Sequence, residues 1–520
     1  MTAHSHLLRV LLASTGALAL AAAEPAPTPP AAAGEGEVML SMTGAVLRAL
    51  DANLDVRIER LMPTIAEQQR RFKVGAFDPH LTAHYTVESL ESPQNTRDFF
   101  STGQTAEILN QDNIRTETNL VGLLPTGTSY KITILAYSLK NTLNREALAR
   151  FYPEYTTSTS LTVTQPLLRG FGIANTLAEV RIAKSQVRSA EQTLRAKVDQ
   201  VAADVLDAYI EAIYSQELIQ VITDRIALAQ RLKDENEKRL NQGLMAPIDV
   251  MQAESTRAAA EIELVRAQSF LNETENHLRE LIFPDFAADA DTRLGFVDRL
   301  QEVKLAESLP ALRALALDRS AEYQVALQAV ETEKLKVRYA RNQRLPTVNF
   351  EASVGMNGLG NSWSTGFSDY SARTQPDYSV GIVADIPLGS HQERANLSQA
   401  LLNLRKAELE VKRDSNRIIS QVQTAYSRVQ SALARTEASA RAVKTAEVAL
   451  GDEEKRLTNG LTTSFNVLKL QDELSQARIN RLEAVAEGQK AVIVLWGVVG
   501  VLLERFQIDA VAAPHVIVRP

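Results

Sequence analysis

Two spacings of apolar residues alternate along this chain, and each predicts a different kind of element. In residues 174–241 apolar side chains recur every three or four positions, with no proline and no internal glycine, and residues 394–457 repeat the pattern. This period is typical of a helix that packs along one face. At about 1.5 Å per residue, the first helix would be roughly 100 Å long. The core of an ordinary single domain could not cover a rod of that length.

Four other stretches alternate apolar and polar residues at every second position, which predicts strands. They cover residues 81–87, 155–163, 348–354 and 378–386. Strands with one apolar and one polar face are typical of a membrane barrel around water, although a soluble sandwich alternates in the same way. Aromatic residues at strand ends, as in the interfacial girdles of barrels, favour the barrel. They are Phe99, Phe100, Phe151, Tyr152, Tyr155, Trp363, Phe367, Tyr370 and Tyr378.

The chain also contains two copies of one plan. EKRLNQGLMAPIDV at residues 237–250 returns as EKRLTNGLTTSFNV at residues 454–467, and the tripeptide ALD occurs at both 49–51 and 316–318. Internal repetition of this kind predicts two structurally similar halves. The first repeat, 38–283, should contain a helix, four strands, a long helix and a half-length helix. The second repeat, 310–503, should contain the same elements with only two strands.

The distance between matching positions locates the difference between the repeats. Pro79 and Pro346 are 267 positions apart, whereas Pro166 and Pro387 are 221 apart, so the first copy has about 46 additional residues between 90 and 155. Alternating residues at 115–124 and 128–140, joined by a short turn at 125–127, predict two further strands. Because two strands are added together, the chain still returns toward the helices after the last strand of the first repeat. The alternative, an external or periplasmic subdomain, stays open.

The half-length helices have lengths that add up to those of the long ones. Residues 248–283 with 310–344 match the first long helix, and residues 465–503 with 38–73 match the second. Each long helix could therefore run antiparallel to two shorter helices stacked end to end. Residues 284–309, rich in proline, aspartate and glycine, predict an irregular equatorial segment, with the tail 504–520 at the same level. A generic two-stranded coiled coil is the simpler alternative, but it needs no such length match.

The turns after the two long helices have a specific composition. Gly243 and Gly460 stand where a helix end favours a left-handed residue, and Leu244 and Leu461 could pack back against the last helical turn. These four residues define the expected helix-hairpin turns.

The first residues of the helices that follow these two turns include the candidate functional residues. Pro247 suits the first helical position and Thr463 suits an N-cap. Asp249 and Asn466 fall near the third position, where an acid favours the helix dipole, so capping is the plain interpretation of Asp249. Lys469 follows one turn later in the second copy.

The N-terminal composition predicts export. Residues 7–23 form a short alanine-rich apolar run behind Arg9, which indicates a signal peptide at 1–23, followed by a Pro/Ala-rich linker at 24–37 that could not continue a buried helix. The chain has no cysteine, so it needs no disulfides and has no cysteine for a lipid anchor. No other stretch reaches about 18 uninterrupted apolar residues, so a membrane crossing would have to use strands. A net charge of −7 with mixed signs argues against a nucleic-acid partner.

Catalytic motifs are lacking. The sequence has no phosphate loop, no nucleophile elbow and no helical metal spacing. His80 and His84 fall on one strand face about 13 Å apart, too far to share one ion, and we interpret them as polar lumen residues. We therefore expect neither enzymatic activity nor a cofactor.

The order of these elements resembles that of TolC-type outer membrane efflux proteins over residues 38–507. The residues that carry the resemblance are ALDAN at 49–53, TQPLLRGFG at 164–172, IPLG at 386–389 and the two KRL-x-x-GL turns. The resemblance implies a mixed α and β membrane protein: a homotrimer whose strands share one transmembrane β-barrel, continued by a long periplasmic α-helical barrel. It also implies an outer membrane channel of a tripartite efflux or type I secretion system. Its partners would be outer membrane lipid, a periplasmic adaptor that contacts the hairpin turns, and an inner membrane transporter.

This chain departs from that family pattern in two respects. Relatives contribute four strands per subunit, whereas six are predicted here, which gives an 18-stranded barrel in a trimer. Relatives place aspartates at the periplasmic constriction of the pore, and the matching residues here are Asp249, Asn466 and Lys469. Lysines beside an acid ring would weaken or reverse cation selectivity.

Two other classes of protein remain as alternatives. A periplasmic adaptor also combines long helices with β structure, but it would have one hairpin in place of two repeated ones. A structural coiled-coil protein of the cell envelope would not need amphipathic strands.

Overall fold

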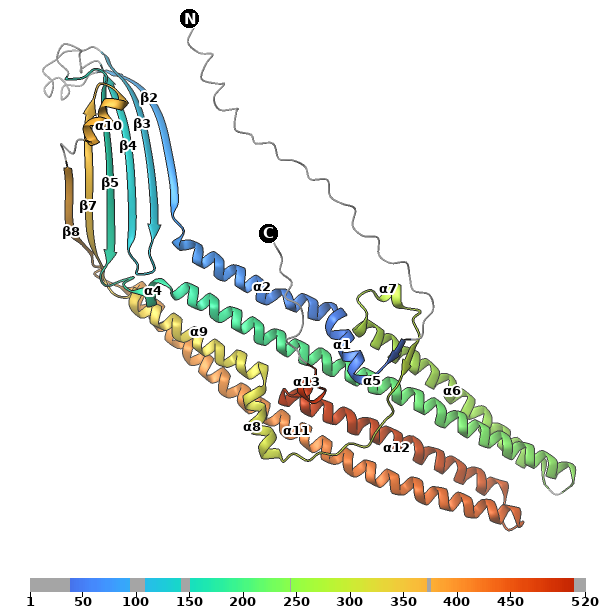
Figure 1. Ribbon diagram of the computed structural model, residues 1–520. Helices are drawn as coiled ribbons and strands as arrows, with labels where there is room; N and C mark the ends of the chain where they lie inside the picture. The colour runs from blue at the N-terminus through green and yellow to red at the C-terminus, as the bar shows by residue number, and fades with distance from the viewer. Residues whose placement is uncertain (1–37, 94–107, 142–149, 244, 372–375, 509–520) are drawn as a thin grey trace, which may run out of the picture.

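The computed structural model describes residues 38–93, 108–141, 150–243, 245–371 and 376–508. The expected signal peptide, the linker and the end of the tail (509–520) lie outside these ranges. Figure 1 shows a curved sheet at one end of the molecule and a bundle of long helices that extends from it to two hairpin ends.

The sheet contains six strands, and each is antiparallel to its neighbours. In sheet order they are β2 (His80–Pro93), β3 (Ile108–Leu123), β4 (Ser129–Asn141), β5 (Glu154–Pro166), β7 (Thr347–Gly360) and β8 (Pro376–Asp385). The inserted segment thus adds two strands to the sheet, β3 and β4, and forms no separate subdomain in its described part. Gly127, with φ +91°, makes the tight turn between them, where Leu124 N donates to Thr128 O. A short helix, α10 (Trp363–Ser371), precedes β8.

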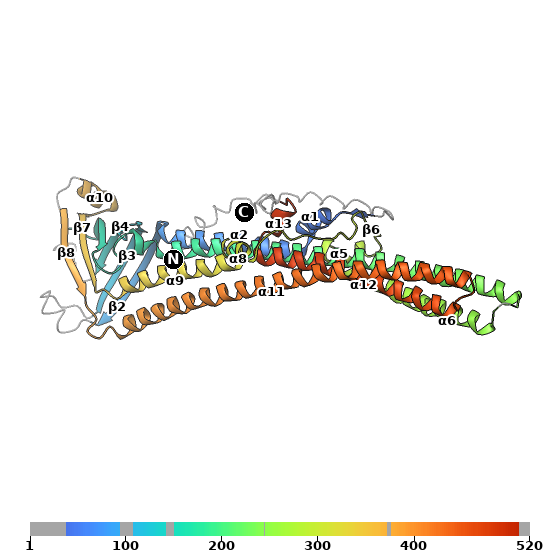
Figure 2. The same cartoon turned by 90° about the horizontal axis from the view of Figure 1, so that it is seen from below.

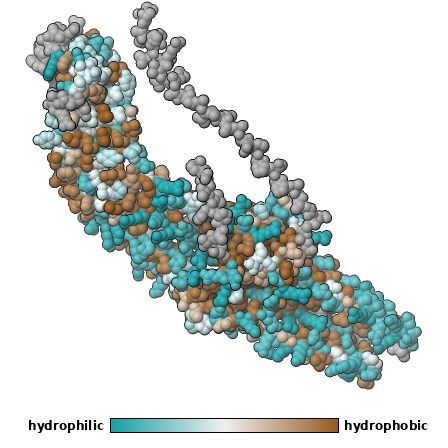
Figure 3. All heavy atoms as spheres, in the orientation of Figure 1, coloured by the Kyte–Doolittle hydropathy of each residue, from teal (hydrophilic) through white to brown (hydrophobic). Residues whose placement is uncertain are grey.

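The strand register separates an apolar face from a polar face. Directly paired residues of antiparallel strands lie on the same face. The pairs Tyr85–Thr116, Thr116–Ala136, Ala136–Thr157 and Thr157–Gly358 therefore place one residue of each of five strands at positions of a common face. On the same face lie Leu81, Val87, Ile134, Leu161, Val354, Val380 and Ile382, all well exposed. Figure 3 shows apolar residues gathered over the sheet, whereas the hairpin ends are mostly hydrophilic.

The two long helices are continuous, as their unbroken period predicts. α5 (Ala178–Asn241) has 64 residues and α11 (His391–Thr458) has 68. α5 returns through α6 (Pro247–Ile282), and α11 returns through α12 (Ser464–Val499). No helix in the described part of the chain is long and apolar enough to cross a bilayer.

The other two expected half-length helices are each broken in two, which the sequence analysis did not predict. α1 (Met42–Ala52) and α2 (Leu54–Val74) meet at Asn53, whose Oδ1 accepts from Asp55 N at 3.0 Å. α8 (Leu309–Arg319) and α9 (Ala321–Gln343) meet at Ser320, the position that matches Asn53. Each of these residues caps the second helix, so a side-chain acceptor restarts the helix in a new direction. The turn η1 (Gly75–Phe77) joins α2 to the sheet.

The expected stacking of short on long helices is only partly correct. α6 runs beside α5 and α12 beside α11, as predicted, and α9 packs against both α5 and α11. α2 packs against α5, however, and not against α11 as predicted. Hydrophobic packing accounts for this arrangement, because the fully buried Val56 of α2 lies in one core cluster with Val201 and Val205 of α5. Two exposed ion pairs join the same helices: Lys73 lies 3.1 Å from Glu179, and Lys197 lies 2.6 Å from Asp55. A match in length could not show which long helix carries the complementary surface.

The middle of the bundle has the expected irregular cover. β1 (Val38–Leu40) pairs in parallel with β6 (Leu294–Phe296), near the short helices α7 (Phe286–Asp289) and α13 (Leu502–Arg505). Tyr209 on α5 is fully buried beneath it, and its hydroxyl, which has one proton to donate, lies 2.7 Å from Leu40 O and 2.9 Å from Asp298 Oδ2. This core holds the bundle together at a level between the sheet and the hairpin ends. A single-turn helix, α4 (Ile173–Thr176), lies next to the sheet end of α5.

Candidate functional site at the hairpin ends

Each long helix ends with a glycine in the left-handed conformation, as predicted. Gly243 has φ +73° and Gly460 has φ +72°, and a Cβ at either position would meet no other atom within 4 Å. Glycine is therefore required by the backbone conformation and not by lack of space. Gly460 N donates to Leu457 O, and Leu461 N donates to Arg456 O at 2.8 Å, which closes the helix end.

The expected hydrophobic contact behind this turn is absent. Leu461 is 68% exposed, so the prediction that it packs against the last helical turn is wrong within this subunit. The backbone hydrogen bonds end the helix without it. Leu244, its counterpart, lies outside the described residues.

The candidate pore residues lie close to these turns. Asp249 is the third residue of α6, behind Pro247 at the first position, and is half-buried. Asn466 is the third residue of α12 and is exposed, and its Nδ2 donates to Thr462 Oγ1 at 3.0 Å. Thr463 occupies the N-cap position, but its side chain accepts no capping hydrogen bond.

Nothing within one subunit joins the three candidates. In the described ranges, no hydrogen bond or ion pair connects Asp249 with Asn466 or Lys469. The Lys469 ammonium instead lies 3.8 Å from Glu473 Oε1, one turn along α12. The three residues thus form no joint site within one subunit.

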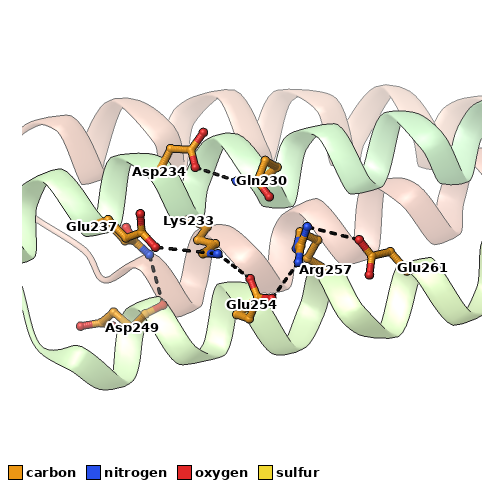
Figure 4. Close-up of polar contacts among 9 residues, drawn as sticks. Gln230, Lys233, Asp234, Glu237, Asp249, Glu254, Arg257 and Glu261 are labelled. Atoms are coloured by element: carbon orange, nitrogen blue, oxygen red, sulfur yellow. Dashed lines mark hydrogen bonds and ion pairs between the residues drawn. The ribbon is translucent and has the colours of Figure 1, made fainter.

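A row of charged residues lies along the first hairpin, and its pair between Lys233 and Glu254 joins the two helices. Lys233 on α5 lies 2.8 Å from Glu254 on α6, and Arg257 lies 2.8 Å from the other Glu254 oxygen and 3.3 Å from Glu261. Figure 4 shows this row of ions, with the Asp249 carboxylate pointing away from it. Hydrogen bonds from Arg257 and Lys233 lower the pKa of Glu254 to about 2.

The second hairpin has apolar residues at the matching positions. Leu450 matches Lys233, and Leu474 matches Arg257; both are at least nine-tenths buried in a core with Leu457, Val467 and Leu468. The two hairpins thus have the same backbone plan, but Lys233 and Arg257 form ion pairs where their counterparts Leu450 and Leu474 are buried in an apolar cluster.

A pH dependence of the first hairpin follows from the ion row. The pKa of Glu254 is lower in the folded hairpin than the value near 4.3 of a glutamate in an unfolded chain. The ionised Glu254 carboxylate therefore stabilises the folded hairpin fully above about pH 4.3, and this stabilisation is lost as the pH falls from about 4 toward 2. We expect Glu254→Gln to reduce hydrogen-exchange protection in the first turns of α6 at pH 7, and the difference from wild type to disappear near pH 2. Glu273→Gln, an exposed change on the same helix, is the control; equal losses in both variants would contradict the assignment.

A buried polar contact connects the ends of the two hairpins. Asn236 on α5 and Ser464 on α12 are each 1% exposed, and Ser464 Oγ donates to Asn236 Oδ1 at 2.9 Å. Asn236 Nδ2 also donates to Asp249 O at 3.2 Å. Because unpaired buried amides are costly, this contact fixes the distance between the two hairpin ends and the start of α6, where Asp249 lies.

Arg225 makes a second connection farther from the ends. Its guanidinium lies 2.6 Å from Glu263 on α6 and also pairs with Asp472 on α12. The Arg225 side chain is only 16% exposed, so one cation joins three helices from both hairpins.

These connecting residues were not predicted from the sequence, although one signal was present. Asn236 continues an apolar row on α5, seven residues after Ala229 and fourteen after Ile222, and both of these are buried. A polar residue in an apolar heptad row indicates a specific buried contact. Arg225 and Asp472 gave no comparable signal. Among the described residues, no group of three or more His, Asp or Glu could hold a metal ion.

Comparison with known proteins identifies the relationship. A family model described as outer membrane efflux protein matches residues 132–282 and 312–501, which is well over half of the chain and leaves out the equatorial segment between the repeats. The outer membrane protein TolC of Vibrio cholerae is 22% identical over 332 residues, covering 63% of this chain and 74% of that protein. The alkaline protease secretion protein AprF of Pseudomonas aeruginosa is 23% identical over 346 residues, covering 65% and 69%.

Solved structures share the fold. The outer membrane protein VceC of Vibrio cholerae aligns with a TM-score of 0.61 at 16% identity, covering 88% of this chain and 96% of that one. The MtrE outer membrane channel of Neisseria gonorrhoeae aligns with a TM-score of 0.61 at 14% identity, covering 88% of each chain. The fold is thus that of channels in which a β-barrel continues into a long α-helical barrel, here built from two repeats. The chain belongs to the outer membrane efflux protein family, the channels of the outer membrane whose helices lie in the periplasm.

Proposed function

We propose that this protein is the outer membrane channel of a tripartite efflux or type I secretion system and works as a homotrimer with one 18-stranded barrel. The observation that carries the proposal is the pair of open edges of the sheet. Among the strands that the structure describes, β2 and β8 have no partner on their outer sides, and every residue of β8 is exposed. Long exposed edges next to an apolar face are unstable in a monomer and are removed by barrel closure.

The strand directions fit closure between copies. β2 leaves the helical bundle after α2, and β8 returns to it before α11, so β2 of one copy and β8 of the next run antiparallel. Six strands from each of three copies give an even number, which an all-antiparallel barrel requires.

The hairpin ends are the proposed adaptor contact. Four large apolar residues near the turns are more than half exposed: Ile248, Met251, Leu461 and Phe465. Exposed apolar residues that cluster among polar ones are typical of protein interaction sites. With Gly243 and Gly460 they form the surface that a periplasmic adaptor would cover, and an inner membrane transporter would supply the substrate. Leu244, the other residue expected at this contact, lies outside the described residues.

Asp249, Asn466 and Lys469 are the proposed constriction of the channel. Three copies would bring three acids and three lysines to the narrow end, where the lysines oppose cation selectivity. We expect Lys469→Asp to shift the reversal potential in a salt gradient toward cations, and Lys469→Gln to give an intermediate shift, in single-channel recordings. Lys304→Asp, which makes the same charge change in the equatorial segment, should leave the preference unchanged. An unchanged preference in Lys469→Asp would exclude this residue from the constriction.

The assembly is tested by membrane fractionation. The protein should be found in the outer membrane fraction, migrate as a trimer before heating and as a monomer afterwards, and form pores in planar bilayers. A monomeric, non-conducting protein in the soluble periplasmic fraction would overturn the proposal. Co-purification of an adaptor and an inner membrane transporter would identify the type of system.

A further inference from the structure

The helix α10 lies on the apolar face of the sheet. The Trp363 ring meets the Tyr155 ring edge-on at 4.6 Å between centroids. A Cβ at Gly366 would lie 3.2 Å from Thr157 Cγ2, and Thr157 is fully buried. Tyr155 and Thr157 belong to the face that carries Leu161, so the helix covers this face and not the polar one.

Glycines of β7 allow α10 to lie very close to the sheet. Gly358 and Gly360 of β7 are buried under the helix, and a Cβ at Gly360 would lie 2.3 Å from Thr365 Oγ1. Glycines at such positions let a helix backbone approach a strand.

Hydrogen bonds fix both ends of the helix. Ser362 Oγ accepts from Thr365 N at 3.2 Å, and Thr365 Oγ1 accepts from Ser362 N at 3.0 Å. At the other end, Asp369 Oδ2 accepts from Leu359 N at 3.2 Å. The first two bonds cap the helix, and the third ties its far end to β7.

The height of α10 matches the outer boundary of a bilayer. Gly358 lies 11 residues beyond Thr347, the end of β7 nearest the helices. At about 3.3 Å per residue and a strand tilt of about 40°, this places the contact roughly 28 Å above the lower edge of the sheet. The apolar band of outer membrane barrels is about 25 Å tall. In Figure 2 α10 also lies on the same side of the molecule as α1, α13 and β6.

We propose that α10 is an interfacial helix that lies against the lipid-facing wall of the barrel, at the headgroup level of the outer leaflet, and contacts membrane lipid. This inference rests on the proposed barrel, in which the apolar face meets lipid. Phe367, one helical turn after Trp363, is 40% exposed, and the described side chains of α10 include one carboxylate. An aromatic helix with little charge suits the boundary between headgroups and acyl chains.

The two tryptophans of the chain allow a direct test. Trp496 lies in the helical bundle with its ring 6.3 Å from that of Phe506, so Trp496→Phe leaves Trp363 as the sole membrane probe. In phosphatidylcholine vesicles brominated near the headgroup end of the acyl chains, we expect Trp363 emission to fall about twofold relative to unbrominated vesicles, and less with bromine near the methyl end. Trp363→Phe, which retains Trp496, should show no quenching. Gly366→Leu, which leaves no room against Thr157, should reduce the quenching while the trimer persists.

The outcomes separate this inference from the proposed function. A trimer that conducts ions but shows no quenching of Trp363 would overturn the position of α10 and leave the channel intact. A protein that neither trimerises nor conducts would contradict the proposed function and the inference together.

Discussion

Val380→Arg is expected to prevent the protein from assembling in the outer membrane. Val380 is 69% exposed on the apolar face of β8 and pairs with Ala352, close to the middle of the sheet's height. An arginine at the bilayer midplane costs a barrel about 2–4 kcal/mol, and three copies would bring the cost to about 6–12 kcal/mol for each trimer. The heat-labile trimer band in outer membrane fractions should therefore be lost or greatly reduced.

Ser379→Arg is the matched control, because the neighbouring residue points to the other face. Ser379 pairs with Ser353 on the polar side of the sheet, where an arginine would face water in the lumen. This variant should assemble like wild type and change only ion preference. Loss of the trimer in Ser379→Arg with normal assembly of Val380→Arg would reverse the assignment of the two faces.

Arg225→Glu is expected to separate the two hairpins near their ends. The change removes the cation shared by Glu263 and Asp472 and places a third carboxylate between them. Breaking a buried pair costs about 3–5 kcal/mol, but the partners here are 42% and 56% exposed, which reduces our estimate to about 1–3 kcal/mol. At about 1.4 kcal/mol for each factor of ten, the population with separated hairpin ends should rise about 5- to 150-fold. Single-channel conductance should increase accordingly.

Two further variants separate this effect from a general loss of stability. Arg231→Glu reverses an exposed charge two turns away on the same helix and should leave conductance unchanged. Arg225→Glu combined with Asp472→Arg restores a pair between α5 and α12 and should recover part of the wild-type behaviour. Equal conductance in wild type and Arg225→Glu would show that Arg225 does not hold the hairpins together.

Much of the fold could be predicted because it depends on repeated local patterns. The period of residues 174–241 predicted α5, and the change in spacing between Pro79 and Pro166 predicted β3 and β4. The breaks at Asn53 and Ser320 were missed, because a single capping side chain interrupts a helix without changing the apolar period on either side. The aromatic girdle was expected at Trp363, but a helix that covers the sheet was not.

The hairpin ends were predictable only at the level of the backbone. The left-handed conformations of Gly243 and Gly460 follow from local sequence, and both are observed. The contact between Asn236 and Ser464 joins residues 228 positions apart and depends on how the hairpins pack. The role of Asp249, Asn466 and Lys469 remains a proposal, since it depends on the approach of other copies.

The proposed barrel is tested most directly by a cryo-electron microscopy structure of the full-length protein in lipid nanodiscs, in which the strands around the membrane section are counted. We predict three copies around one axis and a closed barrel of 18 strands, with β2 of each copy hydrogen-bonded to β8 of the next. A 12-stranded barrel with β3 and β4 outside the wall, or a barrel closed within a single chain, would contradict it.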